Sequence, residues 1–533
     1  MTTNKSKSVL PVVAAVSTGL TVSALLGLYL RYRKRAILTR DPAVYGVPVL
    51  AGAAPLVGNI PEMVSVSEYQ ADWLVEKSKE FGDIFAMTVP LQNLLCTFNV
   101  ADLEAMLKDP YLWQKGPFFR DNLQQFLGHG IFNSDGDAWK NQRKVASNIF
   151  NVKNFRDLFS QVFVDESKKL ASQIATAHSM GGIVELQDLL LRATMDSFTL
   201  IALGKSTDAI DGKGKLDNDG VYVLPRERFM DAFDGANTIS ADRFNMPFWE
   251  IWEYWDGTSA KMNQHLALIE DFAKNVINSK RAKMAEGQKG SDLLDLFMAQ
   301  GDPETGAPLT DQQLRDITLN FIIAGRDTTA QTLSWTFWRL AQNPRVEKKC
   351  REEILLVLGK DGEYTYETFK DLKYTNATFM EALRLHANVH VNSKTASKDT
   401  VLPGTNTPIK AGDTVLFSPY VMGRDEKIWG ADALEFVPER WIDKNGSLIK
   451  PNQFEFPHFN AGPRLCLGMS MAQQEAVVFM STIIRKFSLE LVGDDSPKHW
   501  GRWDPDPAKR AGRESIALTL NARNGITFKV HPV

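Results

Sequence analysis

The stretch FNAGPRLCLGMSMAQQEA, residues 459–476, constrains the fold more than any other part of this sequence. It places Cys466 in a loop between Gly462 and Gly468, and a helix pattern begins directly after the loop. A helix N-terminus favours the thiolate form of a cysteine through its dipole and its free N–H groups, and Arg464 adds a nearby cation. The fold must therefore hold one sulfur at the start of a helix, where it can act as a nucleophile or a metal ligand.

A buried, inert side chain is the usual role of a lone intracellular cysteine. The two glycines argue for another role, because missing side chains let a flat ligand approach the backbone. No other Cys or His lies close enough in sequence to complete a zinc site, and the chain has no C-x-x-C motif for redox exchange. A single thiolate on a single metal points to haem iron, where an axial thiolate favours cleavage of the O–O bond.

Composition excludes some classes of partner. The chain has 533 residues, with 61 basic and 64 acidic side chains and a pI near 6.3. Such a balance provides no basic surface for nucleic acid, so we expect no nucleic-acid partner. Three cysteines cannot build a disulfide framework, and their odd number argues against an oxidising compartment.

The N-terminus predicts a membrane anchor. Residues 8–30 carry no charged side chain and are long enough, at 1.5 Å per residue, to cross a hydrocarbon layer of roughly 30 Å. The cations in RYRKR, residues 31–35, outnumber the two lysines before the span, which predicts that the large domain faces the cytoplasm. A cleaved signal peptide is the alternative. The length of the apolar run and the position of the cations disfavour it.

The rest of the chain divides into a tether and one large domain. We expect residues 1–30 to be the anchor, residues 31–62 to be a basic and Pro/Gly-rich tether, and residues 63–533 to be the functional domain. Helix-period patterns dominate this domain, and the clearest runs from 311 to 343. The segment 514–530 alternates in hydrophobicity and predicts a hairpin. The predicted fold class is mainly α with a small β portion.

Two details of these elements can be checked in a structure. Thr310 and Gln313 have the spacing of a capping box at the start of the long helix, and Pro344 marks its end. The predicted hairpin turns near Asn524 and Gly525, with the alternating apolar residues of its two arms opposite each other.

The cysteine loop resembles that of the cytochrome P450 family of haem-thiolate monooxygenases, because Phe459, Gly462, Arg464, Cys466 and Gly468 fill the fixed positions of its pattern. The resemblance implies the cytochrome P450 fold, with haem b between a long central helix and the Cys-bearing loop, and an N-terminal transmembrane helix. It implies that Cys466 is the axial iron ligand and that the rest of the loop contacts the cofactor.

The middle of the long helix reads AGRDTT, residues 324–329. A buried helix seldom carries Gly325, Asp327 and Thr328 together, because glycine costs about 1 kcal/mol against alanine and a buried carboxylate needs a partner. Gly325 is expected to open a groove, and the Thr328 hydroxyl can hold a water. In the family the matching acid–threonine pair relays protons to oxygen, which implies a catalytic role for Asp327 and Thr328.

The resemblance assigns further charged residues. Glu381 and Arg384 are three apart on one helix, and with Arg440 they match a structural triad that braces the cysteine loop. A surface salt bridge contributing under about 1 kcal/mol is the alternative for such a pair. The predicted cofactor-binding cations, which would contact the haem propionates, are Arg143 with its neighbour Trp139, Arg464 and Lys394.

Three positions depart from the family pattern. Ala387 and Asn388 stand where many members have a Pro-Pro pair, so the loop along the haem edge is expected to follow another course. Ala324 replaces the glutamate that bonds covalently to haem in one branch, which predicts non-covalent haem. His386 and His390 have the spacing of a metal pair but no third ligand, and we expect packing or surface roles for them.

The substrate is expected to be lipophilic. The resemblance places the segment before WKNQR as a loop over the haem. Aromatic clustering there suits an apolar ligand, although ordinary loop packing would give the same residues. The candidate pocket residues are Phe118, Phe119, Phe126, Leu127, Ala324 and Val389. Residues 130–150 and 321–340 look most like the branch that hydroxylates long-chain fatty acids and alkanes at or near the terminal carbon.

The implied activity is that of an oxidoreductase, a monooxygenase that inserts one oxygen atom of O₂ into a C–H bond. Since no G-x-G-x-x-G motif follows a strand, electrons are expected from a separate NADPH-dependent reductase, with cytochrome b5 as a further candidate partner. Lys140 and Lys144 are expected on the docking face for this reductase. The expected location is the endoplasmic reticulum membrane, with one span and a cytoplasmic catalytic domain.

Four alternatives remain at this point. The substrate could be a sterol, a terpenoid or a xenobiotic. The chain could be a haem-thiolate isomerase or dehydratase, which needs no reductant. It could bind haem without turnover. Outside haem chemistry, it could be a membrane-tethered structural protein with a buried Cys466.

Overall fold

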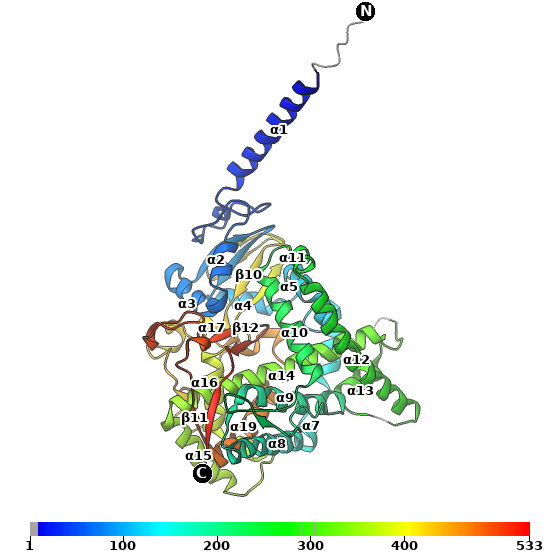
Figure 1. The fold of residues 1–533 in the computed structure, drawn as a ribbon, viewed down its shortest axis with the longest axis vertical. Coiled ribbons are helices and arrows are strands. Elements are labelled where there is room, and N and C mark those ends of the chain that lie inside the picture. Colours follow the sequence, from blue (N-terminus) through cyan, green and yellow to red (C-terminus); the bar gives the residue numbers. More distant parts are fainter. Residues whose placement is uncertain (1–8, 289, 303–304) are drawn as a thin grey trace, which may run out of the picture.

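The computed structural model describes residues 9–288, 290–302 and 305–533. Helix α1 (Val9–Tyr32) projects from one end of the body, and the C-terminus lies at the opposite end (Figure 1). Within the described ranges, no helix combines the length and the apolar character that are needed to cross a membrane. The predicted anchor starts in residues 1–8, which lie outside the described residues.

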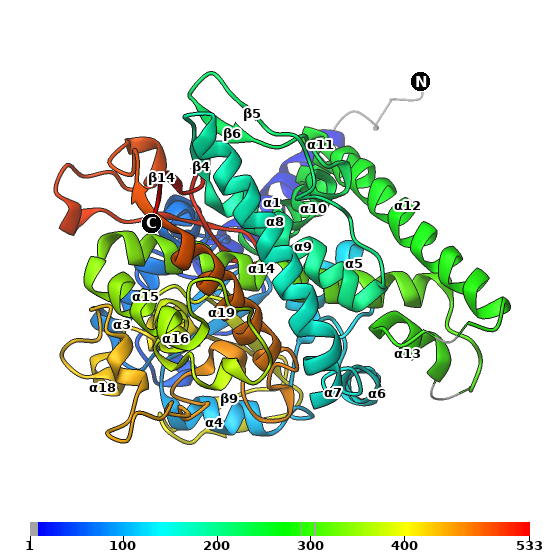
Figure 2. The same cartoon turned by 90° about the horizontal axis from the view of Figure 1, so that it is seen from below.

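The long helix predicted at residues 311–343 is confirmed as α14 (Asp311–Gln342). The predicted capping box is present, because the Thr310 side chain accepts from the Gln313 N–H and the Gln313 side chain accepts from the Thr310 N–H. α9 (Leu186–Leu203) packs along α14, and α19 (Met469–Lys486) lies beside both (Figure 2). The helix is therefore buried on most sides and crosses the centre of the molecule.

The remaining helices surround this centre on several sides (Figures 1 and 2). They are α2 (Ile60–Ser65), α3 (Gln70–Phe81), α4 (Val100–Lys108), α5 (Gly116–Leu127), α6 (Gly136–Ser147), α7 (Val152–Asn154), α8 (Ser160–Ser179), α10 (Arg228–Asp242), α11 (Trp249–Asp256), α12 (Thr258–Ala285), α13 (Leu293–Gln300), α15 (Pro344–Leu358), α16 (Lys373–Leu385), α17 (Pro419–Met422) and α18 (Glu426–Trp429). Short 3-10 turns complete the chain, among them η4 (Arg243–Asn245), η6 (Pro438–Trp441), η7 (Pro457–Phe459) and η8 (Gly462–Arg464).

The β portion is small, as predicted. One sheet has the order β1-β2-β10-β7-β3 and a second has the order β11-β14-β4-β6-β5. The strands of the first sheet are β1 (Ile84–Val89), β2 (Gln92–Thr97), β3 (Trp113–Gln114), β7 (Asn392–Ala396) and β10 (Thr414–Phe417). Those of the second are β4 (Ile183–Glu185), β5 (Lys215–Leu216), β6 (Val221–Val223), β11 (Phe487–Leu491) and β14 (Thr527–Pro532). The remaining pairs are β8 (Thr400–Leu402) with β9 (Thr407–Ile409) and β12 (Glu514–Ile516) with β13 (Leu520–Ala522).

The predicted hairpin over 514–530 is wrong in its pairing. β12 pairs with β13, whereas β14 pairs with β11 and β4. The chain makes a tight turn between β12 and β13, in which the Ala517 N–H donates to the Thr519 carbonyl at 3.1 Å. The predicted turn at Asn524 and Gly525 is present, with φ of 54° and 72° at these residues, but it joins strands of two different sheets.

The segment predicted to be a tether packs against the body. Val49 bridges to Ala86 of β1, and Tyr45 and Leu50 are buried. A bridge between Ala36 and Leu56 closes the segment on itself. The first sheet therefore begins to form contacts well before residue 63.

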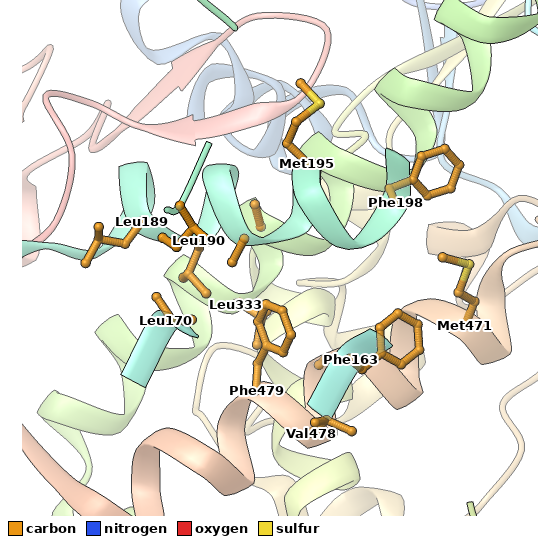
Figure 3. Packing of buried hydrophobic residues seen from close by; sticks show 14 of the residues in the cluster. Phe163, Leu170, Leu189, Leu190, Met195, Phe198, Leu333, Met471, Val478 and Phe479 are labelled. Carbon is orange, nitrogen blue, oxygen red and sulfur yellow. The ribbon is translucent and has the colours of Figure 1, made fainter. Parts of the chain in front are cut away.

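Apolar side chains from α8, α9, α14 and α19 form the main core (Figure 3). Phe163 of α8, Leu190 of α9 and Leu333 of α14 are fully buried there, and Phe479 reaches the same cluster from α19. Burial of each such side chain contributes about 1.5–3 kcal/mol. This core fixes α14 relative to α19, the two helices that frame the candidate site.

Candidate functional site

A cavity of about 430 Å³ lies between α14 and the loop that leads into α19. Its wall includes parts of α5, α6, α10 and α16, together with the turn between β12 and β13. Of the residues singled out from the sequence, the following line it: Phe118, Phe119, Leu127, Trp139, Arg143, Ala324, Gly325, Thr328, Asn388, Val389, His390, Phe459, Arg464, Cys466 and Gly468. Residues far apart in sequence therefore meet around one space of the size of a ligand pocket.

Cys466 opens onto this cavity. Its backbone N–H donates to the Phe459 carbonyl at 2.8 Å, which closes the loop before α19. Burial raises the pKa of the Cys466 thiol, while the backbone N–H groups of Gly468 and Met469 and the charge of Arg143 act in the opposite direction. The cation that acts on the sulfur is Arg143 rather than the predicted Arg464.

The other two cysteines are poor candidates for a ligand role. Cys96 and Cys350 are fully buried in apolar clusters, and neither lines the cavity. Cys350 also makes a contact of 3.2 Å with the Thr378 hydroxyl, and burial raises its pKa to about 12. Of the three cysteines, all within the described ranges, Cys466 faces the space where a group could bind.

The two glycines of the cysteine loop are needed for different structural reasons. Gly468 lines the cavity, and a Cβ there would meet the Cys466 Sγ only at 3.9 Å, which leaves open space beside the sulfur. Gly462 does not line the cavity, and its contact with a cofactor stays a prediction. It has a φ of +60°, and a Cβ would lie 2.4 Å from the Leu107 carbonyl of α4. Gly462 is therefore required for the turn and for packing against α4.

Buried cations gather at one end of the cavity. Arg464 Nη2 donates to Asp135 Oδ1 at 2.7 Å and to the Ser134 carbonyl at 3.1 Å, and its guanidinium lies 4.3 Å from the centre of the Trp139 ring. Its Nε is buried without a hydrogen-bond partner. Burial lowers the pKa of Arg464 to about 10, although Asp135 opposes the shift. Arg143, on the same wall, forms no ion pair with any described residue.

Two lysines add to this positive charge. Lys115, which the sequence analysis did not single out, lines the cavity and lies 3.9 Å above the Phe119 ring. Burial, together with Arg464, lowers the pKa of Lys115 to about 7. Lys394 is buried behind the wall rather than on it, and burial, Lys115 and Arg464 lower its pKa well below the usual range. One carboxylate, Asp135, faces several cations, so this end of the cavity favours a carboxylate ligand.

The three residues of the predicted triad are in contact. Glu381 and Arg384 are fully buried and form two hydrogen bonds of 2.7 and 2.8 Å, and Arg440 Nε donates to Glu381 Oε1 at 3.0 Å. The pair is therefore not the surface salt bridge that its spacing alone would suggest. Trp441 Nε1 donates to the other carboxylate oxygen at 2.9 Å, so the charges are well satisfied.

A short path connects this triad to the cysteine loop. His458 Nε2 donates to the Arg384 carbonyl at 3.2 Å. His458 precedes Phe459, whose carbonyl accepts from the Cys466 N–H. The position of the sulfur therefore depends on a hydrogen-bonded path that starts at the buried charges.

Asp327 and Thr328 point in different directions. Asp327 does not line the cavity. Its carboxylate accepts from Asn237 Nδ2 at 2.8 Å and from Arg326 Nη1 at 2.9 Å, on the side of α10. Burial raises the pKa of Asp327 to about 6, although Arg326 opposes the shift. Thr328 does line the cavity, and its hydroxyl donates to the Ala324 carbonyl at 2.7 Å.

Asn388, one of the positions that depart from the family pattern, contacts this part of α14. Its amide donates to the Thr328 carbonyl and to Thr332 Oγ1, both at 3.0 Å. These two bonds fix the loop after α16 to the helix turn that carries Thr328. The nearby His390 also lines the cavity, whereas His386 stacks on Trp335 at 4.3 Å outside it.

Gly325 lines the cavity, but the ring of Phe198 occupies part of the space beside it. A Cβ at this residue would lie 1.8 Å from the ring of Phe198, which belongs to α9. Gly325 therefore lets the ring of Phe198 pack against α14.

The pocket wall before WKNQR is a helix, α5, rather than the expected loop. Phe119, Leu123 and Leu127 follow each other at helical spacing and line the cavity, together with Phe118. Phe126 is not among the lining residues, and its contact with a substrate stays a prediction. Its ring lies 5.1 Å from that of Phe233 on α10, because one position along a helix turns the side chain by about 100°.

Glu475 of α19 is a second residue that the sequence analysis missed. It is fully buried, lines the cavity and accepts a hydrogen bond from Ser197. Burial raises the pKa of Glu475 to about 8, while the hydroxyls of Ser197 and Thr329 oppose the shift. No cation within the described ranges pairs with it. In the sequence, Glu475 could have been recognised only as a carboxylate on the apolar face of a predicted helix.

These features meet the requirements of haem. A sulfur faces the cavity beside the open side of Gly468, and the unpaired Nε of Arg464 and the free guanidinium of Arg143 could bind carboxylate arms. The remaining wall is largely apolar, which suits a flat macrocycle.

Comparison with known proteins gives a consistent result. The family model described as Cytochrome P450 matches residues 48–503. A protein of Mycosarcoma maydis named cytochrome P450 monooxygenase cyp1 is 39% identical over 483 residues, which cover 88% of this chain and 72% of that protein. Cytochrome P450 86B1 of Arabidopsis thaliana is 36% identical over 481 residues, covering 85% of this chain and 82% of the relative. Cytochrome P450 94A1 of Vicia sativa is 34% identical over 412 residues, covering 74% and 76%.

Proposed function

The chain belongs to the cytochrome P450 family, and we propose that it hydroxylates long-chain fatty acids or alkanes at or near the terminal carbon. As a P450 monooxygenase it is an oxidoreductase that binds haem through a cysteine thiolate and uses O₂, a lipophilic substrate and a redox-partner reductase. The resemblance to the fatty acid and alkane branch supports the substrate class, and so does a cavity walled by Phe118, Phe119 and Leu127.

The observation that carries the proposal is the position of Cys466. We infer that its thiolate would bind haem iron, because the sulfur faces the cavity and α14 forms another part of the same wall. Bound haem would supply the activation of O₂ and the oxidation of the C–H bond. Arg143, Arg464 and Lys115 would hold its propionates, and Ala324 leaves the haem non-covalent.

The residues of α14 would manage protons. Thr328 presents its hydroxyl at the cavity wall, where it can hold a water close to the bound substrate. Asp327 would pass a proton to this hydroxyl or water after its carboxylate turns away from Asn237. The raised pKa of Asp327, about 6, suits a group that gains and loses a proton near neutral pH.

The cellular setting is also part of the proposal. Residues 1–30 would anchor the protein in the endoplasmic reticulum membrane, residues 31–62 would connect the anchor, and residues 63–533 would form the cytoplasmic catalytic domain. The exposed leucines of α1, Leu20, Leu25 and Leu26 among them, support an apolar contact. The electron donor would be an NADPH-dependent reductase, with cytochrome b5 as a second donor. Extraction of membranes with alkaline carbonate tests the anchor. An anchored protein should stay in the membrane pellet.

Two measurements test the function. The reduced, CO-bound protein should show a Soret band shifted strongly to the red, and Cys466→His should lose both this shift and turnover. A panel of long-chain fatty acids and alkanes, incubated with reductase, NADPH and O₂, should yield products hydroxylated at or near the terminus by mass spectrometry. Turnover without reductant would favour the isomerase or dehydratase alternative, and hydroxylation of sterols or terpenoids in place of aliphatic chains would reject the substrate class.

A further inference from the structure

The polarity of the cavity wall changes along its length. The cations Lys115, Arg143 and Arg464 lie together around Asp135 and Trp139. Over the rest of the described wall, the polar side chains are amides, hydroxyls and histidines. Glu475 is the one further residue there with an ionisable carboxyl group. A substrate that reaches away from the cations therefore meets a neutral surface.

Two amides stand at the part of the wall where α3 meets η4. Gln70 is the first residue of α3 and Asn245 is the last residue of η4, and both line the cavity while half-exposed. Gln70 Nε2 donates to Asn245 Oδ1 at 3.4 Å. Within the described ranges, Gln70 Oε1 and Asn245 Nδ2 have no other partner. Whichever of the two amides donates, the carbonyl oxygen of that amide and the NH₂ group of the other stay free.

The arginine beside Asn245 in sequence is already paired. Arg243, two residues before Asn245, is buried, and its Nε and Nη2 donate to the two carboxylate oxygens of Glu253 at 2.7 and 2.9 Å. Two of its three remaining N–H donors bind the Asn122 carbonyl at 3.3 Å and Gln125 Oε1 at 2.6 Å. The positive charge is therefore neutralised and turned away from the cavity.

Charged groups of both signs lie around the two amides. Arg523 donates to the Glu68 carbonyl at 2.6 Å and Arg502 lies over the Tyr69 ring, but neither arginine lines the cavity. Asp242 closes α10 directly before η4, and Glu62 lies on α2, which packs against η4. Lys77 lies 4.0 Å from Glu62 but is nearer to Glu80, at 2.7 Å. An ionised carboxylate at this place would find one free NH₂ group, because the nearby cations are held by other partners: Arg502 by Glu76, Arg523 by the Glu68 carbonyl and Lys77 by Glu80.

We propose that Gln70 and Asn245 form a subsite for the hydroxyl group of a long-chain primary alcohol. A hydroxyl both donates and accepts, which matches the free acceptor and donor of the amide pair, whereas a carboxylate can only accept. The protein then prefers uncharged long-chain alcohols to ionised fatty acids. The inference rests on the proposed function, since it assumes that a long aliphatic chain fills the cavity.

The test uses the full-length, haem-loaded protein and three probes of equal chain length, namely hexadecan-1-ol, hexadecanoate and hexadecane. Dissociation constants come from the change in the Soret absorbance on titration at pH 8. We expect the alcohol to bind more tightly than the acid. Gln70→Leu and Asn245→Leu should each weaken alcohol binding by about three- to tenfold, the range for one neutral hydrogen bond, and leave hexadecane unchanged. Gln161→Leu, at an exposed amide on α8, is the matched control.

The outcomes separate this inference from the function on which it rests. Equal or tighter binding of hexadecanoate to the unaltered protein, or alcohol binding that neither leucine variant changes, would overturn the subsite. Gln70→Lys should improve hexadecanoate binding, because it adds a cation beside the free donor. If none of the three probes binds while bulkier lipophilic compounds do, the aliphatic substrate class itself is wrong and the subsite is rejected with it.

Discussion

Replacement of Glu381 by glutamine tests whether buried charge holds the cysteine loop in place. The Glu381 carboxylate accepts five hydrogen bonds, two from Arg384 and one each from Arg440, Trp441 and the Val437 N–H. Glutamine keeps the shape but removes the negative charge that compensates two guanidinium groups. Breaking a fully buried ion pair costs about 3–5 kcal/mol, since the remaining charge is left without a partner.

Glu439→Gln is a matched control on η6, the short turn that carries Arg440 and Trp441. Its partners Arg345 and Lys349 are about half-exposed, and such surface pairs contribute about 0–1 kcal/mol. Urea unfolding of the haem-loaded proteins, followed by the Soret absorbance, should show a loss of about 3 kcal/mol or more for Glu381→Gln alone. The same variant should also lose part of its red-shifted CO spectrum. If both variants unfold at the same urea concentration, the triad does not stabilise the loop and the reasoning is refuted.

Three further predictions concern other parts of the site. Asn388→Ala removes the amide that binds the Thr328 carbonyl, so we expect several-fold less product per NADPH oxidised with an unchanged CO spectrum; an unchanged ratio would show that this amide does not orient the helix turn. Burial raises the pKa of Glu475 from 4.5 to about 8, so the folded protein keeps a proton that the unfolded chain releases. Stability relative to Glu475→Gln should therefore fall as the pH rises from about 4.5 through 8, by a few kcal/mol in unfolding experiments, and a rise would contradict the assignment. Charge reversal at Lys140 and Lys144 together, both exposed on α6, should slow reduction by the reductase several-fold and weaken its salt dependence in stopped-flow experiments; unchanged rates would remove these lysines from the docking face.

The sequence predicts best those features that depend on neighbouring residues. The capping box at Thr310 and Gln313 is local, and so is the spacing of Glu381 and Arg384 on one helix face. The turn at Asn524 and Gly525 also follows from residue type, because both adopt positive φ. In each case the interacting groups lie within four residues of each other.

Features that depend on tertiary contacts are harder to predict. The residues after the turn at Asn524 pair with β11 and β4, and alternation alone does not identify the partner strand. Phe126 and Leu127 are both apolar, and only the packing of α5 against α10 decides that Leu127 faces the cavity. Lys115 and Glu475 differ from other charged residues only because distant segments bury them. Arg464 and Asp135 act on Lys115, and Ser197 and Thr329 act on Glu475. Such roles require knowledge of which segments meet.

The contact between Gly325 and Phe198 restricts how this protein can change during evolution. A methyl group added at residue 325 would overlap the ring, and a smaller residue at 198 would leave a void beside the helix. Either change alone should be eliminated by selection, whereas both together could be tolerated. Among descendants of this sequence, the two positions are therefore expected to covary, and a library that randomises them jointly should recover functional pairs that single-site libraries miss.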